Sequence, residues 1–327
     1  MNLTIKIESW PIRGHFTISR SSLTDVKVVT VEIFNGTAIG RGECRPYARY
    51  NETPEIVAAQ IEAQRATIES GLSAEKLQRL MPAGAARNAL DCALWDLRCK
   101  AGKTSIWDLI GTARPSPHPT AFTLSVDTPD AMARAAKKAL NFKILKLKVD
   151  RKRVARQLQA VAEARPDCRF IVDANEALLS PDVYALAQHK AHTQIAMIEQ
   201  PIHDKLINEH SFHDYNGPPL CADESIHNVD DLPRLKALGY KAVNIKLDKC
   251  GGFSGALKLI KAAKEQGFLL MGGCMLSTSL AVAPMAALMD NFDVIDLDGG
   301  ALLEKDRKEG LIYENGKVHP PSPQLWG

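Results

Sequence analysis

The chain has 327 residues, of which 45% are apolar and 24% are charged, and its net charge is +3. This composition is typical of a soluble globular protein, and the length predicts two domains or one large barrel. The lack of a basic run argues against nucleic acid or a membrane surface as a partner. The seven cysteines form no CxxC pair, which favours reduced thiols in the cytoplasm. The N-terminal sequence lacks a signal-peptide pattern, and no stretch is apolar for the length of a bilayer.

The N-terminal part of the chain predicts an α+β arrangement. Residues 3–10 and 26–34 alternate between apolar and polar side chains, as strands do. Asn35-Gly36 then separates two apolar runs and predicts a hairpin. Residues 53–71 and 84–102 have helical spacing, and the first of these segments opens with the cap-like pair Thr53-Pro54.

From residue 115 onward, eight short apolar runs alternate with amphipathic helical segments. Polar residues at the ends of these runs recur every 23 to 26 residues, for example at Lys148, Asp173, Glu199, Asp223 and Lys246. A strand, a helix and two short loops need about this many residues, so the repeat predicts parallel strands. Eight such strands predict a closed barrel. A doubly wound open sheet would carry a glycine-rich loop after its first strand, which the sequence lacks.

Polar side chains stand at the C-terminal ends of nearly all the predicted barrel strands. Taken singly, an Asp in such a place is usually a helix cap or a turn residue, and paired lysines are usually solvated. In a closed barrel, however, these ends converge on one mouth, where active sites lie. The residues that would meet there are Lys146, Lys148, Asp173, Glu199, Asp223, Lys246, Asp296 and Asp298.

Asp173, Glu199 and Asp223 follow three consecutive strands, and three neighbouring carboxylates require a cation. Oxygen ligands alone favour Mg²⁺, which we therefore expect as the cofactor. Lys148 and Lys246 belong to the second and sixth strands, on opposite sides of an eight-stranded ring. This arrangement predicts proton transfer at the carbon next to a Mg²⁺-bound carboxylate. One lysine would remove the proton to give an ene-diolate, and the other would return a proton to the opposite face.

Lys146 shares a strand face with Lys148 because side chains alternate along a strand. A second ammonium, a neighbouring Mg²⁺ and burial would each lower the pKa of the Lys148 ammonium toward the working pH. We therefore expect Lys146 to tune Lys148 and to hold the carboxylate of the substrate.

The motifs KLK, DAN, EQP, ADES and NIKLDKCGG resemble the enolase superfamily, in its muconate-lactonizing branch. The resemblance covers nearly the whole chain, and GECRPYARYNET and PAGAARNALDCALWDL are similar to the capping domain of that superfamily. It implies an α/β fold, with a (β/α)7β TIM-like barrel at residues 115–299. It also implies an α+β capping domain at residues 1–114, to which residues 300–327 return. One Mg²⁺ per subunit and the two-lysine chemistry follow from the same resemblance.

Within this branch, the DLDGG motif is characteristic of dipeptide epimerases, in which Asp296 and Asp298 would bind the α-ammonium of the dipeptide. Two carboxylates in a desolvated cavity do favour a cationic ligand. HFTISRS and GCMLSTS further resemble the L-Ala-D/L-Glu epimerases of the enterobacterial type. That likeness implies that Arg20 meets the distal carboxylate of Glu and that Thr123 contacts the substrate. It also implies a cytoplasmic isomerase that serves murein peptide degradation and peptidoglycan recycling.

Several alternatives stay open from the sequence. The same machinery serves N-acylamino acid racemases, o-succinylbenzoate synthases and dipeptide epimerases of other specificity, while a degenerate barrel would be a binding protein. None of the nine histidines fits the His-based mandelate racemase pattern. Ser277 stands where many members of the branch carry an acid, so no role is assigned to it. We expect specificity to lie in capping loops near residues 13–25 and 47–52. The oligomeric state, including a homo-oligomer, is not fixed by the sequence.

Overall fold

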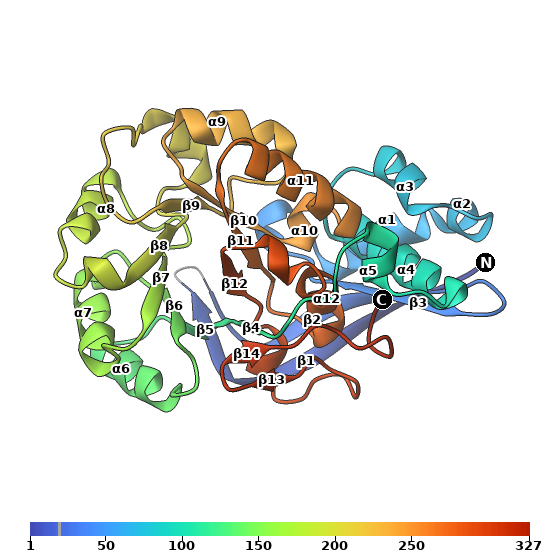
Figure 1. Cartoon of the computed structure of the whole chain (residues 1–327), viewed down its shortest axis with the longest axis horizontal. Helices are drawn as coiled ribbons and strands as arrows, with labels where there is room; N and C mark the ends of the chain where they lie inside the picture. Colours follow the sequence, from blue (N-terminus) through green and yellow to red (C-terminus); the bar gives the residue numbers. More distant parts are fainter. Residues whose placement is uncertain (19–20) are drawn as a thin grey trace.

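The computed structural model describes residues 1–18 and 21–327. An antiparallel sheet covered by helices packs on one side of a larger parallel sheet that curls into a barrel (Figure 1). The smaller sheet contains β1 (Asn2–Ile18), β2 (Ser21–Phe34) and β3 (Ile39–Cys44). The segment that follows carries η1 (Ala48–Tyr50), α1 (Pro54–Glu62), α2 (Arg65–Glu69), α3 (Ala74–Leu80), α4 (Ala85–Gly102) and α5 (Ile106–Ile110).

The antiparallel sheet confirms the predicted hairpin and corrects one predicted loop. Asn35 turns the chain between β2 and β3, and its N–H donates to the carbonyl of Ala38 at 3.2 Å. Residues 13–25, expected to form a loop, lie mostly within β1 and β2. Pairing between these strands is irregular between Pro11 and Phe16 and then resumes with Phe16 opposite Leu23. Cross-strand pairing thus overrides the loop-like local composition.

The predicted helix at residues 53–71 is two helices. Thr53 caps α1 as expected, since its side chain accepts the N–H of Ile56 at 3.2 Å. The chain then leaves helical geometry at Gln64, and α2 begins at Arg65. There the Arg65 guanidinium donates to the carbonyl of Leu3 at 2.7 Å, which ties the start of α2 to β1.

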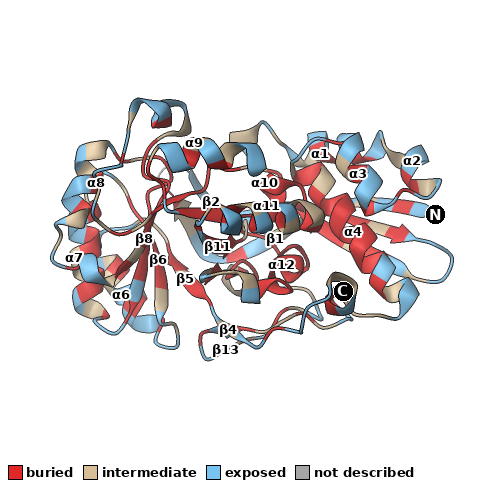
Figure 2. Cartoon of the chain, turned by 45° about the horizontal axis from the view of Figure 1, so that its top comes forward, coloured by how far each residue is buried: buried red, intermediate tan, exposed pale blue. Residues whose placement is uncertain are grey.

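Helix α4 lies directly on β3, because small residues line both surfaces. A side chain at Gly42 would collide with the carbonyl oxygen of Ala89 on α4. Figure 2 shows α4 as a largely buried helix, whereas α6 to α9 around the barrel expose their outer faces. No helix among the described residues is both long and apolar enough to cross a bilayer.

The parallel sheet has eight strands in the order in which they occur along the chain. They are β5 (Ala121–Leu124), β6 (Ile144–Lys148), β7 (Arg169–Asp173), β8 (Ile195–Glu199), β9 (Leu220–Ala222), β10 (Ala242–Ile245), β11 (Leu269–Gly273) and β12 (Val294–Asp296). All eight predicted runs are therefore strands, and every neighbouring pair is parallel.

Helices connect the strands in nearly every unit. They are α6 (Pro129–Lys138), α7 (Val154–Ala164), α8 (Ser180–Ala187), α9 (Leu232–Ala237), α10 (Leu247–Cys250), α11 (Phe253–Glu265) and α12 (Ser279–Ala286). Between β8 and β9, the described chain forms the 3-10 helix η3 (Asp204–Glu209) in place of an α-helix. That connection ends in Gly217-Pro218-Pro219, and proline cannot continue a helix.

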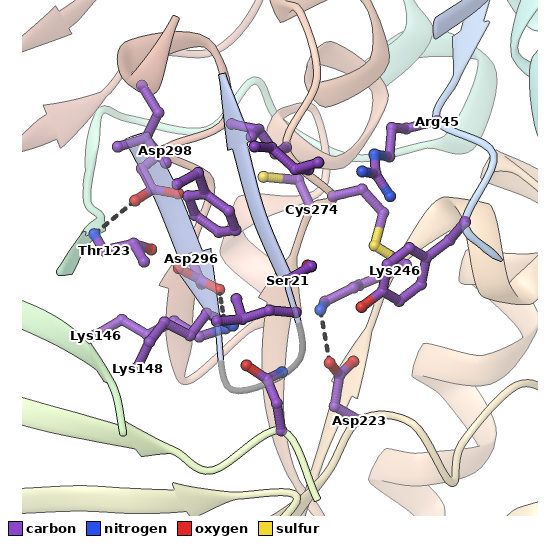
Figure 3. Close-up of a pocket in the computed structure, with 18 of the residues that line it drawn as sticks. Ser21, Arg45, Thr123, Lys146, Lys148, Asp223, Lys246, Cys274, Asp296 and Asp298 are labelled. Atoms are coloured by element: carbon purple, nitrogen blue, oxygen red, sulfur yellow. Dashed lines mark hydrogen bonds and ion pairs between the residues drawn. The ribbon is translucent and has the colours of Figure 1, made fainter. Parts of the chain in front are cut away.

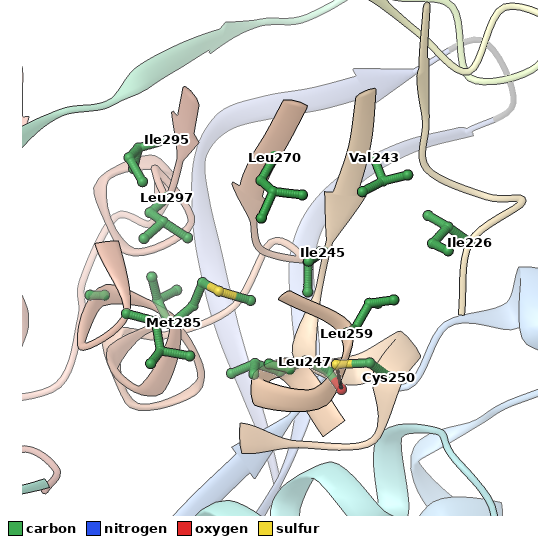
Figure 4. Packing of buried hydrophobic residues seen from close by; sticks show 14 of the residues in the cluster. Ile226, Val243, Ile245, Leu247, Cys250, Leu259, Leu270, Met285, Ile295 and Leu297 are labelled. Atoms are coloured by element: carbon green, nitrogen blue, oxygen red, sulfur yellow. Dashed lines mark hydrogen bonds between the residues drawn. The ribbon is translucent and has the colours of Figure 1, made fainter. Parts of the chain in front are cut away.

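Side chains close the barrel between its first and last strands. The N–H of Leu297 donates to the Thr120 hydroxyl at 2.9 Å, and the N–H of Thr123 donates to the Asp298 carboxylate at 2.7 Å. Apolar residues fill the interior below the mouth, namely Ala121, Ile171, Met197, Cys221, Ala242 and Met271. Outside the barrel, residues of β10 to β12 pack against α11 and α12 (Figure 4).

The C-terminal tail returns to the N-terminal helices. After β12 the chain forms η6 (Gly300–Leu302), β13 (Tyr313–Glu314) and β14 (Lys317–Val318), and β14 pairs with β4 (His118–Pro119). The indole N–H of Trp326 then donates to the carbonyl of Cys92 on α4 at 2.9 Å. The domain limits at residues 1–114 and 115–299 remain a prediction.

Candidate active site

Lys146 and Lys148 point into the barrel, where both side chains are buried. The Lys146 ammonium lies 3.0 Å from the Asp173 carboxylate, 2.8 Å from Glu199 and 2.8 Å from Asp296. The Lys148 ammonium lies 2.5 Å from Asp173. The repulsion between the two ammonium groups is therefore offset by carboxylates from β7, β8 and β12.

A second lysine cluster approaches from the opposite side of the ring. Lys246 follows β10, the fourth strand beyond β6, and its ammonium lies 2.7 Å from Asp223. Lys249 occupies the other oxygen of Asp223 at 2.6 Å. Figure 3 shows Lys146 and Lys148 entering one side of the pocket and Lys246 entering the other. Sequence reasoning missed Lys249, although its place three residues after Lys246 put it on the same side of a helix.

The three predicted metal ligands lie at neighbouring strand ends and are buried. Asp173 pairs in register with Glu199, and Asp223 directly follows β9. Asn244, another residue that the sequence did not single out, donates to Glu199 at 2.8 Å. Burial and the Asp173 charge raise the pKa of Glu199 to about 8.

Ammonium groups contact all three carboxylates, and no three His, Cys, Asp or Glu side chains of the described residues form a metal-binding group. One oxygen of Glu199 nevertheless makes no hydrogen bond to any described residue, although it lies 2.8 Å from the Lys146 ammonium. The donors of Asp173, Glu199 and Asp223 are all hard oxygens. The residues present therefore fit a divalent cation such as Mg²⁺.

The carboxylates raise the pKa of two other cavity lysines, Lys146 and Lys246, while the expected effect of Lys146 and a bound Mg²⁺ on Lys148 stays a prediction. Burial disfavours the charged form of Lys146, but Asp296, Glu199 and Asp173 outweigh it and raise its pKa well above the usual value. Burial likewise opposes the charge of Lys246, yet Asp223 raises its pKa. For these two lysines the attraction of the carboxylates is larger than the opposing effect of burial.

Asp296 and Asp298 line the same cavity from β12 and the residues after it. One oxygen of Asp296 has no hydrogen-bond partner among the described residues, while its other oxygen meets Lys146. Asp298 accepts the backbone N–H of Thr123 at 2.7 Å. Burial and the Asp296 charge raise the pKa of Asp298 to about 7. This carboxylate pair favours a cationic ligand.

The cavity lies between the barrel mouth and the antiparallel sheet, and the empty space in it, counted together with the open solvent at its mouth, is about 740 Å³. Its barrel side carries Lys146, Lys148, Lys246, Asp296, Asp298 and Thr123, and its other side carries Phe16, Ile18, Ser21, Leu23, Arg45, Tyr47 and Tyr50. Arg20 lies outside the described residues. Ser277 is buried and donates to the carbonyl of Met275 at 2.9 Å.

Comparison with known families accounts for both parts of the chain. Residues 1–111 match "Mandelate racemase / muconate lactonizing enzyme, N-terminal domain", and residues 130–324 match "Enolase C-terminal domain-like". The chain belongs to the enolase superfamily. Within this superfamily it falls in the mandelate racemase and muconate lactonizing group, so the predicted family and α/β fold are confirmed.

Members of this superfamily that resemble the chain are isomerases. The chain is 42% identical to the L-Ala-D/L-Glu epimerase of Escherichia coli K12, with 97% of this chain and 99% of the relative covered. It is 38% identical to an N-acetyl-D-glutamate racemase of a Pseudoalteromonas species, over 92% of this chain and 95% of the relative.

Two solved structures of the superfamily are similar over almost their full length. A family member from Agrobacterium tumefaciens, described as homologous to dipeptide epimerases and holding sodium and L-Ala-L-Glu, is 40% identical, with a TM-score of 0.93 and 99% of each chain covered. A dipeptide epimerase from Enterococcus faecalis, complexed with Mg and L-Leu-L-Tyr, is 27% identical, with a TM-score of 0.90 over 98% of this chain and 97% of the other. Epimerases of this superfamily thus hold a metal ion together with a dipeptide.

Proposed function

We propose that the chain is a Mg²⁺-dependent dipeptide epimerase that inverts the α-carbon of the C-terminal residue of L-Ala-D-Glu and L-Ala-L-Glu. The observation that carries the proposal is one cavity with lysines on opposite sides and a pair of buried carboxylates beside them. Two bases suit inversion, because a proton can leave one face of the carbon and return to the other. The likeness to epimerases that act on alanyl-glutamate supports the choice of substrate.

We assign the metal to Asp173, Glu199 and Asp223, whose oxygens lie at neighbouring strand ends. Mg²⁺ bound there would neutralise negative charge that develops on the substrate carboxylate. Lys146 holds that carboxylate, since its buried ammonium already bridges the acidic groups.

Lys148 and Lys246 carry the proton transfer in this proposal. The neutral amine of one lysine takes the α-proton, and the electron pair of the broken C–H bond moves into the substrate carboxylate. The ammonium of the other lysine then gives a proton to the opposite face of the carbon. Both side chains line the cavity, and they come from strands on opposite sides of the ring.

Asp296 and Asp298 would bind the free α-ammonium of the dipeptide, and Thr123 would contact the substrate beside Asp298. Arg20 is assigned to the distal carboxylate of Glu from the family resemblance alone, because it lies outside the described residues.

Racemisation of N-acylamino acids is the second candidate function, and the 38% identity to an N-acetyl-D-glutamate racemase favours it. Such substrates lack a free α-ammonium, so Asp298 and the unpaired oxygen of Asp296 would receive no positive charge from the ligand, and Lys146 alone would face the pair. A buried carboxylate pair without a cationic ligand is costly, which is why we prefer the dipeptide.

Incubation with Mg²⁺ in D₂O, followed by ¹H NMR and chiral analysis, tests the proposal. L-Ala-L-Glu should lose its glutamyl α-proton signal and give L-Ala-D-Glu, EDTA should stop the exchange, and added Mg²⁺ should restore it. N-acetyl-L-Glu serves as the competing substrate. Absence of exchange with a full panel of Ala-X and X-Glu dipeptides would reject the dipeptide assignment.

We extend the proposal to the cellular compartment, the partners and the oligomeric state of the enzyme. Its seven cysteines are all free thiols, which suits a reducing cytoplasm. A small dipeptide released from murein is the expected partner, with no role for nucleic acid or membrane. Size-exclusion chromatography with light scattering would determine whether the subunits form a homo-oligomer.

A further inference from the structure

Arg45 lies in the wall of the cavity that faces the barrel lysines. It follows β3 directly, and it lines the cavity together with Tyr47, Tyr50 and Lys246. In Figure 3 its guanidinium points into the pocket, on the side of Lys246 and away from Asp298 and Thr123. The chain therefore places a second type of cation in the cavity, outside the lysine and carboxylate cluster.

The Arg45 guanidinium has no carboxylate partner among the described residues. Its Nε is buried and makes no hydrogen bond, and the ring of Tyr47 lies 5.0 Å from the guanidinium carbon. The nearby Asp248 carboxylate accepts the backbone N–H of Arg45 at 3.0 Å and the amide of Asn88 at 2.9 Å. Burial lowers the pKa of Arg45, and the charges around it do not fully compensate.

Other partly buried arginines of the described chain have hydrogen-bond partners, which are carboxylates for Arg307 and Arg49 and backbone carbonyls for Arg87. Arg307 lies 2.6 Å from Glu43 and 2.5 Å from Glu8, and Arg49 lies 2.8 Å from Glu176. A guanidinium removed from water is normally matched by a carboxylate, because its desolvation is otherwise uncompensated. Arg45 differs from these arginines because its buried Nε has no partner among the described residues and its side chain lines the cavity, where a ligand can supply the anion.

The α-carbon of the substrate carries four groups. Three of them are placed by the barrel residues, and the fourth is left to reach Arg45. The carboxylate is drawn to Lys146 and the acidic strand ends, and the hydrogen must face Lys148 or Lys246. The amide nitrogen connects the α-carbon to the N-terminal residue of the dipeptide, whose α-ammonium binds Asp296 and Asp298. Only the side chain is left for the remaining wall, where Arg45 lies.

We propose that Arg45 is a specificity-determining residue that receives the carboxylate of an acidic side chain on the residue being epimerised. The planar guanidinium fork matches a carboxylate, and Tyr47 supports it from one face. The inference rests on the proposed function for the orientation of the substrate. It concerns only the side chain, however, so it applies equally to an N-acyl amino acid in the same cavity.

The test compares L-Ala-L-Glu with its neutral isostere L-Ala-L-Gln in the wild type and in Arg45→Gln. We expect the variant to lower kcat/KM for the glutamyl dipeptide on the order of 100-fold, mainly through KM, because a charge-assisted contact is lost. The glutaminyl dipeptide should change less than about threefold, since it makes no such contact. Because both substrates are measured on the same protein, partial misfolding cancels in their ratio. Arg45→Lys, which retains the charge, should keep part of the preference.

Arg41→Gln is the matched control. Arg41 lies on β3 and donates to the carbonyl of Leu325 at 2.7 Å, outside the cavity lining. Its loss should lower Tm without changing the Glu-to-Gln ratio. An equal effect of Arg45→Gln on both dipeptides, or a wild type without preference for Glu, would overturn the inference.

The same comparison with N-acetyl-L-Glu and N-acetyl-L-Gln separates this inference from the proposed function. If the wild type acts only on the N-acyl pair and Arg45→Gln abolishes its preference for Glu, the dipeptide assignment fails while the role of Arg45 stands. Exchange with neither pair would reject both.

Discussion

At the barrel mouth every predicted catalytic ammonium meets a carboxylate of the protein, whereas across the cavity the Arg45 guanidinium meets none among the described residues. The lysines of the barrel side are paired with carboxylates of the protein, which fixes the positions of the lysines before a substrate enters. The capping side instead leaves a cation for the ligand. In our proposals the paired lysines perform the chemistry, whereas Arg45 selects the side chain of the substrate.

The largest effect is expected for the two lysines. Lys148→Ala should abolish exchange starting from one stereoisomer, and Lys246→Ala should abolish it from the other, each on the order of 10³-fold. Deuterium incorporation into L-Ala-L-Glu and L-Ala-D-Glu, measured separately, checks this. Loss of exchange with the same isomer in both variants would contradict the two-base assignment.

Removing the negative charge opposite the dipeptide ammonium should have the next largest effect. The double variant Asp296→Asn, Asp298→Asn should raise KM for L-Ala-L-Glu on the order of 100-fold, because it removes the charges that would pair with the ammonium. Kinetics with N-acetyl-L-Glu provide the control, since that substrate carries no ammonium. Equal loss with both substrates would indicate a structural role for the pair.

Metal binding should stabilise the fold, because a ligand of the native state raises its free energy of unfolding. At a concentration about 100 times Kd the gain is about 2.7 kcal/mol, which corresponds to a rise in Tm of about 4 °C for a chain of this length. Differential scanning calorimetry with Mg²⁺ and with EDTA measures this shift. Asp173→Asn should remove it, whereas Asp214→Asn, at an exposed site, should retain it. An unchanged Tm in the wild type would argue against the metal site.

A smaller effect is expected at Arg20. Arg20→Met should raise KM for L-Ala-L-Glu roughly 10-fold and leave L-Ala-L-Ala nearly unchanged, because only the first substrate has a distal carboxylate. Steady-state kinetics with both dipeptides, in parallel with Arg45→Gln, would show which arginine sets the preference. Loss of the preference in Arg20→Met alone would assign the role to Arg20.

The last effect, at Asp248 where the two regions meet, concerns the pH dependence of stability and leaves the specificity unchanged. Burial raises the pKa of its carboxyl to about 7, even though Asn88 donates to it at 2.9 Å. The folded state therefore keeps a proton that the unfolded state loses above its ordinary pKa of about 4. This group contributes most at low pH, and its contribution falls as pH rises toward 7, by at most about 1.4 kcal/mol per pH unit. Urea unfolding from pH 4 to 8 should show this slope in the wild type and a flatter one in Asp248→Asn.

Most of the barrel and its charged strand ends could be predicted because the signals are local. Alternation along KILKLKVD and the regular interval from Lys148 to Lys246 follow from strand and helix geometry alone. The bounds of the capping elements were less predictable, as at residues 13–25, where strand pairing overrides composition.

The sequence by itself determined the superfamily, the eight parallel strands and the side chains that stand at their ends. Only the tertiary structure decided which charges meet, including Lys249 on Asp223 and the unmatched guanidinium of Arg45. The first pairing depends on neighbouring units of the barrel, and the surroundings of Arg45 depend on how the N-terminal region packs on the barrel, for example through Asn88 on α4 and Asp248 on α10, which are 160 residues apart. Contacts of that kind leave no periodic trace in the chain, because each is set by the packing of distant elements rather than by local geometry.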